Sequence, residues 1–236
     1  MLFGNYLFTC EFSEPALLPP YKGSTFRGVV GQALKKVVCV LKRKDCSECL
    51  LQKNCVYFFV FETPRKENQF SGKKRIGSPP HPYVIEPPLT DKINFSSGDH
   101  FKFRLLLFGK ANDYLPYLIY ALDQRGEKGV GKRNNHFRGR FILKEVLSGK
   151  EIIYSLKEKK ITAYQPEGLT LNDLFPSSTL RQVTGVELSL RTPLRVKFQN
   201  QLFKDNDNVM LPFHILTRAM LRRIASLFTY YDNGEP

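Results

Sequence analysis

The sequence lacks any long apolar run, because its apolar stretches are short and interrupted by charged residues. A transmembrane helix needs roughly 20 consecutive apolar residues, so no membrane span is expected. The first residues, Met1–Phe8, lack the basic leader and the apolar core of a secretory signal. No strongly amphipathic basic helix carries exposed aromatic anchors, which argues against a membrane surface as partner. These absences predict a cytoplasmic protein without a membrane partner.

Acidic residues are too few to balance the basic ones. The 236 residues include 36 Lys and Arg but 22 Asp and Glu, which gives a formal net charge of +14 and a pI of about 9.6. This excess favours a polyanionic partner over the alternative of a merely soluble basic surface. The basic residues gather in clusters: Lys42–Lys44, Lys73–Arg75, Lys128–Arg140, Lys157–Lys160, Arg191–Lys197 and Arg218–Arg223.

The periodicity of the apolar residues predicts an α+β fold. Alternating or continuous apolar runs indicate strands, and spacings of three and four residues indicate helices. The resulting order of strand, helix, strands, helix and strand is that of the ferredoxin-like split β-α-β fold. We predict strands at 2–12, 101–108, 137–147 and 151–154, a long loop at 61–90, and helices at 24–41 and from Asn112 or Asp113 to Gly126.

A second unit is expected to follow. The segment 183–203 favours strands and 211–231 favours an amphipathic helix. One strand region and one helix are half of a ferredoxin-like domain, and such a half must pack on the first domain, pair with another chain, or belong to a truncated molecule. We therefore divide the chain into residues 1–180, a first ferredoxin-like domain with a cysteine-rich insert at 39–55, and 181–236, the start of an incomplete second one.

The helix predicted at 24–41 is interrupted by glycine. Ser24 is placed to cap its N-terminus. Gly28 and Gly31 each cost about 1 kcal/mol relative to Ala within a helix, which indicates that a bulky group, either another backbone or an RNA strand, approaches closely. The same surface carries the basic residues Lys35 and Lys36, which we predict to contact phosphates.

A glycine-rich and basic segment, Gly126–Arg140, is the other predicted phosphate contact. Glycines expose backbone N–H groups to phosphates, and neighbouring basic side chains add charge. An ordinary helix-to-strand turn is the alternative. The predicted RNA-binding residues are Gly129, Gly131, Lys132, Arg133, Arg138 and Arg140.

Four cysteines lie close together in the sequence. Cys39, Cys46, Cys49 and Cys55 have the spacing C-x6-C-x2-C-x5-C. In the cytoplasm such a cluster favours tetrahedral coordination of a structural zinc ion over disulfides. An iron–sulfur cluster and uncoordinated thiols are the alternatives. Cys10, on a predicted strand, is expected to be a core residue.

Several segments, taken in order, resemble one family. The run Pro19–Gly28 leading into a helix resembles the signature helix of the repeat-associated (RAMP) superfamily of CRISPR proteins. With the other segments, the chain resembles the CRISPR-associated endoribonuclease that processes precursor crRNA. The further matching segments are the cysteine cluster, Phe61–Pro64, Pro80–Pro88, Leu107–Ala111, Tyr114–Tyr117, Gly126–Lys132 and Leu190–Arg195.

The resemblance implies two tandem ferredoxin-like domains and RNA cleavage without a catalytic metal. The ribose 2′-hydroxyl attacks the adjacent phosphate, which requires a general base and a stabilising cation. In the family a histidine and a tyrosine near the first helix often serve, but none of the four histidines here lies within 24–41. The candidate catalytic residues are therefore Tyr21, Lys22 and Arg27, with Lys35 nearby, and, beside the glycine-rich segment, His136.

Two functions follow from the resemblance. The first is an endoribonuclease that binds a CRISPR repeat RNA and cleaves it. The second is a non-cleaving RAMP subunit that holds crRNA together with other subunits of a CRISPR effector complex. The missing helix histidine, and the absence of a glycine-rich loop after residue 231, favour the second. The cysteine cluster and the proline-rich match favour the first.

Overall fold

The computed structural model of the protein describes residues 1–42, 45–63, 79–134, 137–162, 164–166, 184–185, 187–198, 201–202 and 211–232. These residues form one large sheet, three small two-stranded sheets and three α-helices. None of the helices in these ranges is long and apolar enough to cross a membrane.

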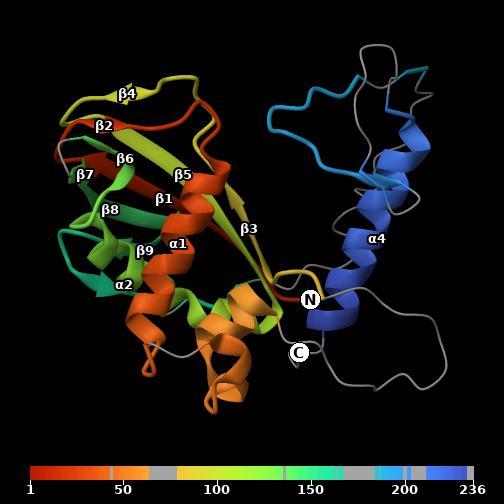
Figure 1. Ribbon diagram of the computed structural model, residues 1–236, viewed down its shortest axis with the longest axis horizontal. Helices are drawn as coiled ribbons and strands as arrows, with labels where there is room; N and C mark the ends of the chain where they lie inside the picture. Colours follow the sequence, from red (N-terminus) through yellow and green to blue (C-terminus); the bar gives the residue numbers. More distant parts are fainter. Residues whose placement is uncertain are drawn as a thin grey trace.

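The large sheet has six strands in the order β10-β9-β8-β1-β5-β3. Along the chain, four of its strands alternate with two helices as β1, α1, β3, β5, α2, β8. Numbered in chain order, these four lie side by side as fourth, first, third and second, with antiparallel neighbours. This is the ferredoxin-like arrangement, so the predicted α+β fold class is confirmed (Figure 1). The bounds are β1 Phe3–Phe12, α1 Gly23–Val38, β3 Tyr83–Glu86, β5 His100–Phe108, α2 Leu115–Gly126 and β8 Phe141–Ser148.

Shorter elements surround this framework. Strand β9 pairs with β8 across the turn at 148–151, as predicted. Two of the small sheets, β2–β4 and β6–β7, lie near each other in Figure 1, and β2 contacts both β6 and β7. Their bounds and those of the remaining elements are β2 Ala16–Leu17, β4 Asn94–Phe95, β6 Val130–Asn134, β7 Phe137–Gly139, β9 Glu151–Ser155, β10 Lys160–Ile161, β11 Lys197–Phe198, β12 Gln201–Leu202, the 3-10 turns Cys46–Glu48, Gln52–Asn54 and Gly109–Tyr114, the π-turn Phe58–Glu62, and α4 Phe213–Tyr231.

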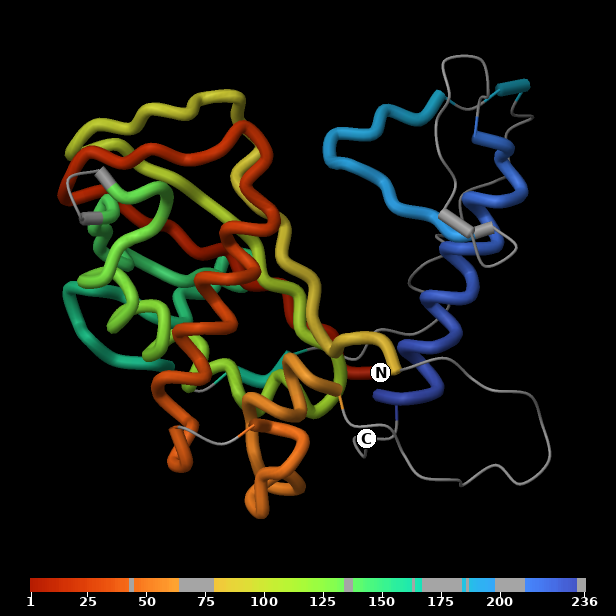
Figure 2. Tube along the Cα trace, viewed as in Figure 1, coloured from red at the N-terminus to blue at the C-terminus, as the bar shows by residue number. Residues whose placement is uncertain are grey.

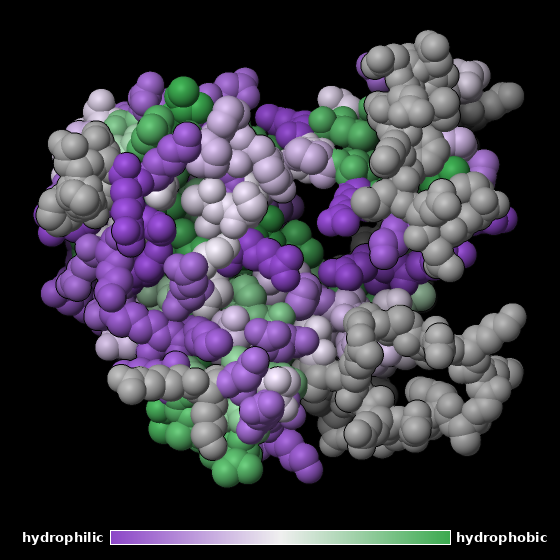
Figure 3. All heavy atoms as spheres, viewed as in Figure 1, coloured by the Kyte–Doolittle hydropathy of each residue, from purple (hydrophilic) through white to green (hydrophobic). Residues whose placement is uncertain are grey.

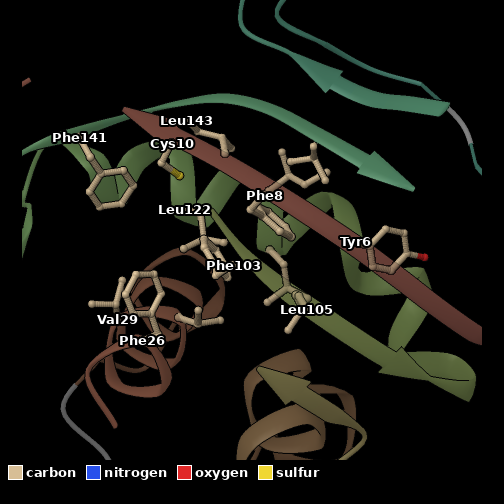
Figure 4. Close-up of a cluster of buried hydrophobic side chains, with 14 of the residues drawn as sticks. Tyr6, Phe8, Cys10, Phe26, Val29, Phe103, Leu105, Leu122, Phe141 and Leu143 are labelled. Atoms are coloured by element: carbon tan, nitrogen blue, oxygen red, sulfur yellow. The ribbon is translucent and has the colours of Figure 1, made fainter. Parts of the chain in front are cut away.

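One face of β1 supplies the centre of the core. Tyr6, Phe8, Cys10 and Phe12 are all buried on alternate positions of the strand, as expected where one face of a strand meets the core. The Phe8 ring stacks on Phe103 of β5 with centroids 4.9 Å apart (Figure 4). The prediction that Cys10 is a core residue is confirmed, and burial raises the pKa of its thiol.

Helix α1 covers this face with its apolar side. Phe26, Val29 and Leu34 are buried, and the Phe26 ring lies 5.1 Å from that of Phe103 (Figure 4). Each such side chain contributes about 1.5–3 kcal/mol when it leaves water. The remaining side of α1 is left to solvent and to the loops around it.

A buried lysine, not a serine, fixes the start of α1. The N-cap position belongs to Lys22, and no side-chain cap is formed, so the prediction of Ser24 as the cap is wrong. The Lys22 side chain is 1% exposed. Its Nζ atom donates hydrogen bonds to the carbonyl oxygens of Pro20, at 3.0 Å, and Thr90, at 2.7 Å. The ammonium group thereby ties the start of the helix to a distant loop.

The second helix begins later than predicted. Asn112 does not cap a helix but lies buried in the 3-10 turn before α2. Its side-chain amide donates to the Gly109 carbonyl at 2.8 Å, and its Oδ1 atom accepts a hydrogen bond from the Tyr6 hydroxyl at 2.9 Å. The polar side chain therefore links the turn to β1. The predicted helix end at Gly126 is confirmed.

One strand was missed in the segment predicted as a loop. Residues 64–78 of that segment lie outside the described ranges, but Tyr83–Glu86 form the edge strand β3. Prolines precede and follow this strand closely, at Pro82 and Pro87, and they obscured its pattern because proline is rare in central strands.

The C-terminal helix α4 contacts the ferredoxin-like domain through its last turn. Leu227 and Tyr231 form a small cluster with Phe108, and the Met1 amino group forms an ion pair with Asp232. The blue end of α4 and the red start of the chain accordingly lie side by side in Figure 2. Within 183–203, the described residues contain one short hairpin, β11–β12, which is less strand than predicted. The division into domains at residue 181 stays a prediction.

Candidate nucleic-acid interface

A basic pocket opens between α1, α2 and the β6–β7 hairpin. Its volume is about 590 Å³. Five of the eight side chains that line it are Arg or Lys and two are Glu. Hydrophilic side chains dominate this part of the surface in Figure 3. The residues that line this pocket, called the basic pocket below, are Glu14, Gln32, Arg125, Glu127, Lys128, Arg133, Arg138 and Arg140.

Glycines bring the hairpin close to the end of α2. Gly129 has a φ of 68° and Gly131 a φ of 95°, values that favour glycine. A Cβ atom at Gly129 would meet the backbone oxygens of Arg138 and Gly139. The Gly129 N–H donates to the Arg125 carbonyl at 3.2 Å. The Gly129 N–H therefore bonds within the chain in this structure, and the glycine lets β6 and β7 pack on the helix end, while its predicted contact with RNA stays a prediction.

Positive charges in the pocket outnumber their partners. Glu14 forms an ion pair with Arg140, which lowers the pKa of the Glu14 carboxyl. Burial, and then the charge of Arg138, lower the pKa of Arg125. The Arg125 Nε atom is buried and has no hydrogen-bond partner within the described residues. Cations that repel one another across a pocket are stabilised when an anion binds between them.

The structure brings together three of the eight predicted RNA-binding residues in the pocket and a fourth beside it. Arg133, Arg138 and Arg140 line the basic pocket. Lys36 lies beside it, and the neighbouring charge of Lys128 lowers the pKa of Lys36. Lys132 is exposed on β6 but does not line the pocket, and Gly131 packs over the backbone of β2.

Lys35 was predicted to bind RNA and Arg125 was not, but the structure reverses their positions relative to the basic pocket. Lys35 lies on another side of α1, with its Nζ atom 5.0 Å from the centre of the Tyr57 ring. Arg125 lines the pocket, yet the sequence analysis did not select it. A basic residue in the last turn of a helix that leads into a glycine-rich segment was the signal that could have found it.

A second polar group lies on the side of α1 where Arg27 projects. The Arg27 Nη2 atom is 3.1 Å from the His81 Nε2 atom. The His81 ring packs 5.5 Å from that of Tyr83. The His81 Nδ1 and Tyr83 hydroxyl atoms are buried and lack hydrogen-bond partners within the described residues. We call His81 and Arg27 the histidine pair.

The surroundings of His81 favour its uncharged form. Burial, followed by the charges of Arg27 and Arg223, lowers the imidazole pKa from the usual 6.5, and Glu62 opposes this shift. Arg223 belongs to α4, so the last helix contributes one of the charges that act on His81. A neutral imidazole at neutral pH can accept a proton.

The predicted catalytic residues that the structure describes have different surroundings. Tyr21 is exposed, and Arg27 is exposed beside His81. Lys22 is buried with its ammonium group bound to two backbone carbonyls, so it does not reach a ligand in this structure. His136 lies outside the described residues. His81, which the sequence analysis did not select, is the residue that the fold adds.

The four clustered cysteines are partly exposed thiols without disulfides. Thiolates are the donors that zinc prefers. However, the described residues, which include all four cysteines, contain no group of three or more Cys, His, Asp or Glu that could hold a metal ion. Cys46 lies next to the Lys35 ammonium group, and this contact raises the lysine pKa. Zinc binding stays a prediction.

Comparison with known proteins identifies the family. The model of the AF_1859_N family, described as an N-terminal domain, matches residues 1–167, and the chain belongs to this family. An uncharacterised protein of Archaeoglobus fulgidus is 24% identical over 218 residues, which cover 92% of this chain and 66% of that protein. The chain thus spans slightly less than two thirds of the length of this relative.

A solved structure was also found. It is the Csm3–Csm4 subcomplex of the type III-A CRISPR-Cas interference complex, with 14% sequence identity and a TM-score of 0.40. The match covers 62% of this chain and 78% of the other. A TM-score of this size is too low to support an inference.

Proposed function

We propose that the protein binds the RNA of a CRISPR repeat through the basic pocket. The observation that carries this proposal is the gathering of Arg125, Arg133, Arg138 and other cations between α1, α2 and the β6–β7 hairpin. Basic side chains on a shallow surface suit the phosphates of a single RNA strand. We propose CRISPR repeat RNA in particular because the sequence resembles RAMP proteins.

The net charge of +14 supports a polymer over a small anion. A strand that crosses the basic pocket also meets Lys36 and Lys132, which lie beyond its lining. For single strands, the logarithm of the binding constant falls with that of the salt concentration, with a slope of about −0.7 for each phosphate neutralised. If the protein neutralises about four phosphates of the strand, the slope is near −3. A lone phosphate ion gives a shallower slope, between 0 and about −1.

Fluorescence anisotropy with a labelled repeat RNA, in excess chelator, tests the binding. The Arg133→Ala and Arg138→Ala double variant is expected to bind at least about tenfold more weakly than the wild type, because each substitution removes a charge-assisted contact. The Lys150→Ala and Lys157→Ala double variant is the matched control, because it removes the same charge from exposed residues that do not line the basic pocket. Equal affinities for the arginine double variant and the wild type contradict the proposal.

Two finer functions share this site. In the first, the bound RNA is precursor crRNA, and the protein cleaves it by attack of a 2′-hydroxyl without a metal ion. In the second, the protein is a non-cleaving subunit that holds crRNA beside other subunits of a CRISPR effector complex. The histidine pair is the observation that favours cleavage. A product with a 2′,3′-cyclic phosphate end, formed in excess chelator, distinguishes the two.

We also propose that zinc binds the cysteine cluster and stabilises the segment after α1. The spacing of the cysteines and their thiolate chemistry support this proposal. Elemental analysis of protein prepared without chelator is expected to give about one equivalent of zinc, which Cys49→Ser lowers and Cys10→Ala does not. Less than about half an equivalent in the wild type contradicts it.

A further inference from the structure

Gly28 is a helix glycine that packing among the described residues does not require. A Cβ atom placed at Gly31, in the next turn, would lie 2.9 Å from the Phe61 ring, so packing explains that glycine. A Cβ atom at Gly28 meets nothing within 4 Å among the described residues. Glycine is a poor helix former, and its presence at an open position is explained if an external group approaches the backbone there.

The position of Gly28 connects the two polar groups already described. It lies one turn before Gln32, which lines the basic pocket, so the two residues share one side of α1. It is also the chain neighbour of Arg27, which holds His81. An extended RNA strand could therefore leave the basic pocket at Gln32, cross α1 over the bare backbone of Gly28 and reach the histidine pair at Arg27.

We propose that the RNA strand crosses α1 at Gly28 and that His81, paired with Arg27, is the general base that activates the 2′-hydroxyl at the cleaved phosphate. This inference rests on the proposed RNA binding by the basic pocket. It replaces the histidine expected within the first helix by one that lies two residues before β3 and contacts Arg27 in the first turns of that helix.

The hydrogen bond between Arg27 and His81 places the reactive lone pair. A guanidinium group only donates hydrogen bonds, so the His81 Nε2 atom accepts, and the ring proton is on Nδ1. The His81 Nε2 atom takes the proton of the 2′-hydroxyl, the O2′–P bond forms, and the P–O5′ bond breaks. The leaving 5′-oxygen takes a proton from water, and the imidazolium returns its proton to solvent.

Positive groups beside His81 stabilise the charge that develops on the phosphate. Arg27 is exposed, so its guanidinium can turn from the imidazole to a phosphate oxygen when RNA binds. Arg223 of α4 adds a second positive charge near the ring. Tyr83 packs on the imidazole and holds its plane. These contacts come from α1, β3 and α4, whose relative placement therefore sets the geometry of the site.

The test is cleavage of an end-labelled repeat RNA in excess chelator, with binding measured on the same samples. His81→Gln is expected to lower the rate constant at saturating RNA by about 100-fold or more, with an unchanged dissociation constant. His214→Gln, an exposed histidine on α4, is the matched control and should cleave as the wild type does. A His81→Gln variant that cleaves at the wild-type rate overturns the inference.

A readout on the unmodified protein guards against a variant that fails to fold. Four groups face His81: Arg27 of α1, Arg223 of α4, Glu62 and Tyr83. Because the base must be uncharged, the cleavage rate should fall with decreasing pH, with a midpoint below the usual histidine pKa of 6.5. A rate that does not change through that range overturns the role of His81.

The strand path has its own test. Gly28→Ala is expected to raise the melting temperature, because alanine favours the helix, and to weaken RNA binding or cleavage at least about threefold, because the methyl group occupies the crossing. Unchanged binding and cleavage overturn the path. Wild-type protein that binds RNA but yields no product overturns the catalytic inference alone. A wild type that does not bind removes the proposed function as well.

Discussion

Two rows of residues along α1 have opposite surroundings. Arg27, Gly31 and Lys35 follow each other at four-residue spacing and contact His81, Phe61 and Tyr57, respectively. Each residue of that row has a side-chain neighbour from another part of the chain, although Arg27 itself is exposed, and its glycine is explained by packing.

The row of Gly28, Gln32 and Lys36 is the exposed one and borders the basic pocket. A single helix thus separates the basic pocket from the region of His81, where burial and then the charge of Arg27 lower the imidazole pKa. Binding and reactivity are expected to respond to different substitutions, even though the two rows are about 100° apart on one helix.

The largest expected effect comes from a substitution that destabilises α1 and so affects both rows at once. Lys22→Met leaves the Pro20 and Thr90 carbonyls without their donor and is expected to lower the free energy of unfolding by about 2–4 kcal/mol. Both rows depend on the start of α1, so binding and cleavage should fall together. Urea denaturation measures the change, with Lys150→Met as the exposed control. A loss below about 0.5 kcal/mol would show that the buried ammonium is dispensable.

The next largest effect is expected on cleavage and not on RNA binding. Arg27→Gln is expected to lower the cleavage rate constant at saturating RNA by about 100-fold, as expected for loss of a group that stabilises developing charge. The dissociation constant should change less than about threefold, because the basic pocket is intact. Single-turnover kinetics over a range of protein concentrations give both quantities. A dissociation constant that rises as much as the rate falls would place Arg27 in binding alone.

The Arg138→Ala variant is expected to have the opposite effect, on RNA binding and not on cleavage. It should raise the dissociation constant about tenfold and leave the rate constant at saturating RNA unchanged, since one charged contact in the basic pocket is lost. The same variant should reduce the steepness of the salt dependence by about 0.7, the contribution of one phosphate on a single strand. Titrations at several salt concentrations measure both, and an unchanged slope would contradict a phosphate contact.

The smallest effect is a gain. Glu14 pairs with Arg140 at the edge of the basic pocket and competes with the ligand for that guanidinium. Exposed ion pairs of this kind are worth at most about 1 kcal/mol, so Glu14→Gln should tighten RNA binding by about twofold to fivefold. Glu151→Gln, on β9, removes the same charge elsewhere and should not. Weaker binding by Glu14→Gln would show that the pair positions Arg140.

Periodic segments were predicted well because they bury one face. The helix predicted at 24–41 is α1, Gly23–Val38, and the strand predicted at 101–108 is β5, His100–Phe108. Strand β3 was missed because its four residues lie between prolines and gain their place from hydrogen bonds to β5. Sequence periodicity carries no information about such a partner.

The candidate site was predicted in part for a related reason. Arg133, Arg138 and Arg140 were selected because charge clusters are visible in the sequence. His81 was missed because its partner Arg27 is 54 positions away, and only the fold brings the two together. Lys22 was selected as a candidate catalytic cation, whereas its burial depends on the loop that contains Thr90, between β3 and β4. In both cases, the surroundings of the residue depend on a contact with a segment that is distant in the sequence.

The contact between Tyr231 and Pro80 couples two parts of the molecule. The Tyr231 hydroxyl donates to the backbone carbonyl of Pro80, the residue directly before His81. The last turn of α4 thus acts as a clamp on the backbone that carries the imidazole. Because the same turn also packs on Phe108 of β5, displacement of the helix would disturb the peptide unit beside His81 and the end of that strand together.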